Sequence, residues 1–160
     1  MLTWGEILLR LVVAALLGGL IGWEREARRK PAGLRTLILV TLSAAMFVVA
    51  SQQAALQHGE SIDAVRAMAG IAQGVGFLGA GAIVQSHGQV RWLTTAAAMW
   101  AAAAIGFAAG MGMYGVAIGG GVFVFVTLKW LAIIEDRWFQ DEGKKEKKKG
   151  QNESAEEDRS

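Results

Sequence analysis

The sequence predicts an all-α, polytopic membrane protein with about five transmembrane helices. Three observations lead to this fold class: 53% of the residues are hydrophobic, the apolar residues form long uncharged runs, and the charges gather in a few segments. About 20 consecutive apolar residues suffice for a helix to cross the hydrocarbon core. We therefore expect a transmembrane domain at residues 1–140 and a disordered, charged cytoplasmic tail at 141–160.

Five apolar runs mark the expected helices. The first runs from Trp4 to Trp23, with a tryptophan at each membrane interface. It begins without a basic segment, unlike a cleaved signal peptide, so we interpret it as an uncleaved helix. The other helices are expected at about 34–56, 64–85, 93–109 and 113–134.

Basic residues lie mainly on one predicted side of the membrane. Of the 16 Lys and Arg residues, only Arg10 and Arg66 fall outside the segments predicted to be cytoplasmic. Because loops rich in Lys and Arg stay in the cytoplasm, we predict an external N-terminus and a cytoplasmic C-terminus.

A glycine-rich stretch, residues 70–83, allows two interpretations. Its Gly74-x-Gly76-x-x-Gly79 has the spacing of a dinucleotide-binding turn, but that turn requires a preceding strand and an acidic residue about 20 positions later. Met99 and Trp100 stand where the acid is needed. We therefore predict a packing helix whose glycines face other helices or a second subunit. These glycines are Gly70, Gly74, Gly76, Gly79 and Gly81, and Gln73 is the polar side chain among them.

Two arginines beside the predicted spans have both a structural and a functional interpretation. Arg10 follows Glu6 by one helical turn, which favours a local ion pair, with a role inside the helix bundle as the alternative. Asp63 lies three residues before Arg66, which favours a helix N-cap with a local salt bridge. The alternative there is an outward-facing carboxylate that attracts cations or partners.

The first cytoplasmic loop is our leading candidate for a functional cluster. Pro31 and Gly33 form a turn, after which Arg35 re-enters the membrane close enough to pair with Glu24. The alternative is that these charges only fix the topology. The proposed cluster consists of Glu24, Arg25, Lys30, Arg35 and Thr36.

Several ordered motifs resemble the membrane domain of the MgtC/SapB family. They are Gly22-Trp23-Glu24-Arg25-Glu26, Lys30-Pro31-Ala32-Gly33-Leu34-Arg35-Thr36, Asp63-x-x-Arg66, Gly74-x-Gly76-Phe77-Leu78-Gly79-Ala80-Gly81 and Leu93-Thr94-Thr95-Ala96-Ala97. The family's usual proline after the loop aspartate is Ala64 here. MgtC-type members also carry a C-terminal ACT-like domain, whereas this chain has a charged tail, so the resemblance implies a short form.

The resemblance implies a protein of the bacterial inner membrane that supports survival at low magnesium and, in some members, virulence. It also implies restraint of the ATP synthase and effects on phosphate uptake. Our first hypothesis is therefore a non-enzymatic regulator that acts through helix contacts, with the lipid bilayer around it, a homodimer favoured, and no nucleic acid or cofactor as partner.

The second hypothesis is a transporter of magnesium or another small ion or solute. Its candidate residues are Arg10, Glu24, Arg25, Arg35, Asp63, Arg66, Gln73, Thr94 and Thr95. A divalent cation needs oxygen ligands at depth, and we expect no carboxylate inside a span. We expect no enzyme and no metal site, because the two histidines fall in separate loops and the chain has no cysteine.

Overall fold

The computed structural model describes residues 2–86 and 89–131, and this part of the chain consists of helices, one short hairpin and the turns and loops between them. The helices are α1 (Trp4–Ala27), α2 (Leu34–Gln57), α3 (Ala64–Ala82), α4 (Leu93–Gly110) and a fifth helix, Tyr114–Leu131. The strands are β1 (Val84–Ser86) and β2 (Gln89–Arg91), which pair antiparallel. The helical fold class is confirmed, and the tail at 141–160 lies outside the described residues.

Four of the described helices are long and apolar enough to cross a membrane, and α3 is not among them. Arg66, Gln73 and the glycines of α3 lower its mean hydropathy. Residues 1–125 form one compact unit and a second begins at Val126, whose described part, 126–131, continues the fifth helix. The membrane orientation stays a prediction.

The helix boundaries agree with the expected ones to within one residue except at two places, and the expected end of the fifth helix at 134 lies outside the described residues. α3 ends at Ala82, three residues early, because β1 starts at Val84; the expected loop at 86–92 is largely a hairpin. α1 continues one turn beyond Trp23, because Glu, Arg and Ala favour helix. It then ends in a Schellman motif, in which Lys30 N–H bonds Arg25 C=O (3.0 Å) and Arg29 has a positive φ of 53°.

The core of the 1–125 unit lies where α1, α2 and α4 meet. Glycines on α1 and α4 let the three backbones approach closely. A Cβ at Gly22 would lie 2.7 Å from Leu34 Cα, and one at Gly106 would lie 2.8 Å from Thr41 Cα. Thr41 itself is fully buried, and its hydroxyl donates to backbone carbonyls of its own helix. Glycine at these positions is therefore a packing requirement.

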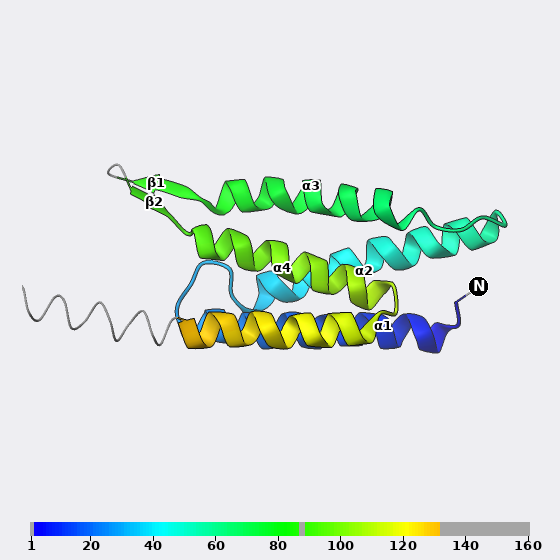
Figure 1. The fold of residues 1–160 in the computed structure, drawn as a ribbon, viewed down its shortest axis with the longest axis horizontal. Helices are drawn as coiled ribbons and strands as arrows, with labels where there is room; N and C mark the ends of the chain where they lie inside the picture. Colours follow the sequence, from blue (N-terminus) through cyan, green and yellow to red (C-terminus); the bar gives the residue numbers. More distant parts are fainter. Residues whose placement is uncertain (1, 87–88, 132–160) are drawn as a thin grey trace, which may run out of the picture. The chain divides into compact units, whose positions relative to one another are not determined.

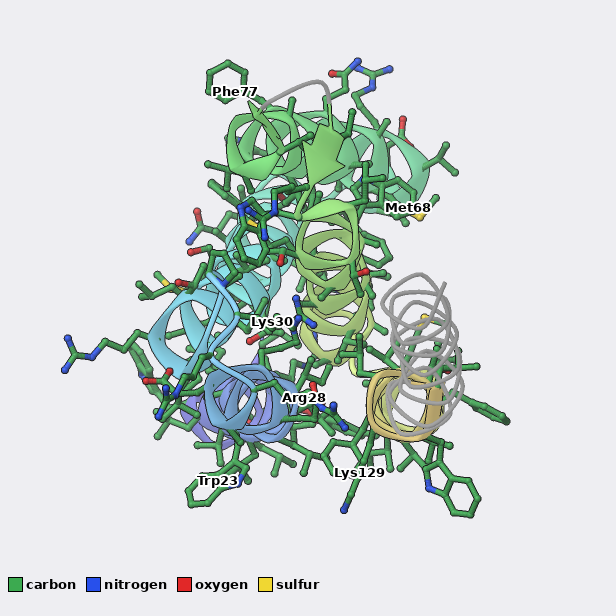
Figure 2. The ribbon with its side chains drawn as sticks, turned by 90° about the vertical axis from the view of Figure 1, so that its left-hand side faces the viewer. Trp23, Arg28, Lys30, Met68, Phe77 and Lys129 are labelled. Carbon is green, nitrogen blue, oxygen red and sulfur yellow. The ribbon has the colours of Figure 1, made fainter. Side chains whose placement is uncertain are left out.

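Helix α3 packs on α4 and α2 and lies on their far side from α1 (Figure 1). Figure 2 shows Phe77 of α3 and Trp23 of α1 pointing away from the helices on opposite sides. Phe77 is 80% exposed. Such large apolar side chains on the outer surface suit a protein surrounded by lipid.

Candidate functional site

A buried polar cluster forms at the last turn of α1. Glu24 is 6% exposed and Arg25 is 3% exposed, although both were expected in an open loop. That expectation is wrong because α1 extends to Ala27 and its last turns pack against the start of α2 and against α4. The charge pattern predicted neither the end of α1 at Ala27 nor the burial of these two side chains.

Arg25 joins α1 to α4. Its Nη2 donates a hydrogen bond of 2.7 Å to the hydroxyl of Thr95, 70 residues away in the sequence. Thr95 is also buried, whereas its neighbour Thr94 is exposed. The buried Arg25 Nε makes no hydrogen bond with any residue that the structure describes. A buried hydrogen bond to a charged group contributes about 1.5–3 kcal/mol, so this contact fixes the helix pair.

Glu24 pairs with Arg28 along the same helix, with Glu24 Oε1 2.5 Å from Arg28 Nε. The expected Glu24–Arg35 pair is therefore wrong: Arg35 is exposed near the start of α2, and Glu24 is buried. Within the described residues, Glu24 Oε2 accepts no hydrogen bond. The site thus holds a buried carboxylate beside Arg25 and Arg28, inside a helix apolar enough to cross a membrane. The expectation of no carboxylate within a span stays a prediction, since the length and composition of α1 do not place Glu24 relative to the bilayer.

Glu26 has a role that the sequence analysis missed. Its Oε2 accepts a hydrogen bond of 2.8 Å from the backbone N–H of Leu34, the first residue of α2. The N-cap residue, Gly33, has no side chain to do this. A carboxylate also interacts favourably with the positive end of the helix dipole. The sequence did contain a signal for this contact, because an acidic residue precedes a helix whose N-cap residue has no side-chain oxygen.

The other members of the predicted cluster lie apart from this buried group. Lys30 and Arg35 are exposed, and Thr36 is half-buried. Gln73, the candidate polar residue of α3, is exposed as well. The structure therefore reduces the predicted cluster to Glu24 and Arg25, and adds Arg28 and Thr95.

Arg10 takes the interior role, the alternative that the sequence left open. Its Nη1 donates to Gln52 Oε1 (2.5 Å) on α2 and to the carbonyl of Gly110 (2.8 Å) at the end of α4. Glu6 instead completes a capping box with Thr3. Gln52 was not identified from the sequence, because a lone amide near a helix end gives no signal of its partner.

Asp63 and Arg66 form the local arrangement that the spacing favoured. Asp63 is the N-cap of α3 and accepts from the Arg66 backbone N–H at 3.0 Å. The side chains form an exposed ion pair at 3.3 Å. Exposed pairs of this kind contribute about 0–1 kcal/mol, so the cap is the larger structural effect.

The glycines of α3 mostly face open space. Gly79 packs against α4, where its Cβ would lie 3.5 Å from Ala96 Cβ. A Cβ at Gly70, Gly74, Gly76 or Gly81 would meet nothing within 4 Å. The expectation that these glycines face other helices of the same chain is thus wrong for all but Gly79, and contact with a second subunit stays a prediction. Gly70 and Gly74 line a groove of about 760 Å³ between α2 and α3.

The residues of the buried polar cluster lie within a match to a known protein family. The model of the MgtC family matches residues 11–137. The chain belongs to the MgtC family. This MgtC-family match contains the Arg25–Thr95 contact, the buried Glu24 and the Asp63 cap, while Arg10 lies one residue before it.

Named relatives agree with this assignment. The chain is 38% identical to Protein SapB of Bacillus subtilis over 82% of its own length, and 40% identical to the putative magnesium transporter YhiD of Escherichia coli K12 over 78%. It is 47% identical to Protein MgtC of Brucella abortus over 73%. The matches cover 60%, 60% and 48% of these relatives, so the chain spans about half to three fifths of their length. No solved structure matches the chain.

Proposed function

We propose that this protein is a non-enzymatic regulator of the bacterial inner membrane that acts through helix contacts, with a homodimer as its simplest assembly. The observation that carries the proposal is the outward face of the fifth helix. Gly115 and Gly119 lie one turn apart with nothing within 4 Å of a Cβ at either position. Val122 and Phe123 are exposed beyond them, Phe123 by 77%.

Such a face suits close contact between helices in lipid. Two small residues four positions apart allow the backbone of a second helix to approach closely. In lipid there is no hydrophobic effect between helices, so close packing drives their association. The core glycines are already used inside the chain, whereas Gly115 and Gly119 have open space around them. Family membership supports a role in adaptation to low magnesium and, in some settings, virulence, with the ATP synthase or phosphate homeostasis as the regulated process.

The test is self-association of two differently tagged copies of the full chain in membranes, measured by crosslinking and co-purification. Gly119→Leu should reduce association about tenfold or more, because a bulky side chain separates the helices. Gly5→Leu is the matched control, since Gly5 is equally open but lies at the start of α1. Equal association of both variants and the wild type would contradict the proposed contact face.

A transporter is the second candidate, and the buried Glu24 favours it. A carboxylate with a free oxygen inside an apolar helix is a common feature of ion pathways. Magnesium and phosphate flux into proteoliposomes would test it, with Glu24→Gln expected to abolish magnesium flux and exposed Arg35→Ala to preserve it. Absence of flux for both ions in the wild-type protein would exclude this function.

A further inference from the structure

The groove between α2 and α3 is mainly apolar. Leu39 and Phe47 of α2 and Leu78 of α3 line it, each about half exposed or more, and Met99 of α4 also contributes. The groove is also lined by Arg66 near the start of α3 and Ser51 near the end of α2, here called the Arg66 end, and by Thr36 near the start of α2. The 15 residue steps from Thr36 to Ser51 rise about 22 Å along α2.

The lining of the groove suits a hydrocarbon chain. Its walls are mainly apolar and in part exposed, so a chain from the surrounding lipid can lie between α2 and α3. One leaflet of the hydrocarbon core is about 15 Å thick, half of about 30 Å. An extended lipid chain therefore fits the length of the groove, and Ala67, Gly70 and Gly74 keep the α3 wall free of bulk.

The charges at the Arg66 end suit a phospholipid headgroup. The Arg66 side chain is 88% exposed and that of Asp63 is 56% exposed. The ion pair uses Arg66 Nε, and neither Nη atom donates a hydrogen bond to a described residue. A guanidinium binds phosphate oxygens well. Because Asp63 balances the charge, this end suits a headgroup that carries both a phosphate and an ammonium group better than an anionic one.

We propose that the α2–α3 groove binds one chain of a phospholipid with an amine-bearing zwitterionic headgroup, with its phosphate on Arg66 and its ammonium beside Asp63. The site is independent of the dimer face on the fifth helix. It gives α3, which lacks the tight glycine contacts of the core, a lipid partner that fills the space beside α2.

The experiment measures lipid retained by the purified full-length protein in detergent by native mass spectrometry. The probes are phosphatidylethanolamine, phosphatidylglycerol and glycerophosphoethanolamine, which has no acyl chains. We expect one phosphatidylethanolamine per chain, held about tenfold more tightly than phosphatidylglycerol, and no binding of the chain-free compound. Tighter binding of phosphatidylglycerol, or binding of the chain-free compound, would overturn the proposal.

Two variants with matched controls locate the site. Gly74→Leu puts a side chain into the groove and should reduce retention at least tenfold, whereas Gly76→Leu, also in open space but not lining the groove, should not. Arg66→Gln should reduce retention about tenfold, and exposed Arg35→Gln should leave it unchanged. Circular dichroism would establish that each variant is folded. Equal retention by Gly74→Leu and Gly76→Leu would overturn the proposal, as would a change of oligomeric state in Gly74→Leu without lipid loss.

Discussion

The glycines of α1 and α4 and those of α3 have different surroundings. In the core, a Cβ at Gly22, Gly106 or Gly110 would come within 3 Å of the α2 backbone. On α3, a Cβ at Gly70 or Gly74 would meet nothing within 4 Å. The same residue type therefore closes one helix interface and leaves another surface open. The glycine count of a membrane helix does not identify its interface; the neighbours of each glycine do.

A glycine-to-alanine substitution should change the free energy of unfolding much more in the core than on α3. Gly106→Ala places a Cβ against the backbone of Thr41, which cannot move away without separating α4 from α2. We expect a loss of about 3 kcal/mol or more in the free energy of unfolding. Gly79→Ala adds a Cβ at an ordinary contact distance from Ala96 and should change stability by less than about 0.5 kcal/mol.

The measurement is denaturant unfolding in detergent micelles, followed by circular dichroism. Similar losses of unfolding free energy for Gly106→Ala and Gly79→Ala would show that α4 packs equally tightly on α2 and on α3. That result would contradict the difference between the two groups of glycines.

The Arg25–Thr95 hydrogen bond joins α1 to α4 within the core, and α3 has no corresponding buried bond among the described residues. Thr95→Val leaves a buried guanidinium without its acceptor and should cost about 1–3 kcal/mol. Thr94→Val is the control, since Thr94 is exposed one residue away. A double-mutant cycle with Arg25→Leu should show coupling. Additive effects would mean that the bond contributes nothing to stability.

Arg10 holds the opposite end of the core. Arg10→Met keeps much of the side-chain length but removes the bonds to Gln52 and to the Gly110 carbonyl. We expect a loss of about 2 kcal/mol, measured by the same unfolding experiment. Arg35→Met, at an exposed position, should fall within about 0.5 kcal/mol of the wild type. Equal stability of the two variants would contradict an interior role for Arg10.

The smallest effect is expected at the start of α3. Asp63→Ala removes the N-cap acceptor for Arg66 N–H and should cost about 1 kcal/mol. Asp63→Asn keeps a capping oxygen and loses only the exposed ion pair, so it should cost less. Amide hydrogen exchange in the first turn of α3 would separate the two variants. Faster exchange throughout α1 as well would contradict a local effect of the cap on α3.

Local patterns predicted much of the fold. The apolar run before Gln57 and the Pro31–Gly33 turn placed α2 within one residue of its observed end and at its observed start. The spacing of Asp63 and Arg66 predicted the cap of α3, because a cap involves residues only three positions apart. Charge placed the end of α1 too early, at Trp23, because charged residues normally mark solvent and here Arg25 has a distant buried partner.

The helical class, most helix limits and the MgtC-family motifs follow from the amino-acid sequence, because they depend on apolar runs, caps and turns within a few residues. The burial of polar groups and the packing of individual glycines become visible in the folded chain. Arg25 meets Thr95 across 70 residues, and Arg10 meets Gly110 across 100. Such contacts depend on how helices rotate and pack against one another, and neither the spacing nor the composition of one segment records that.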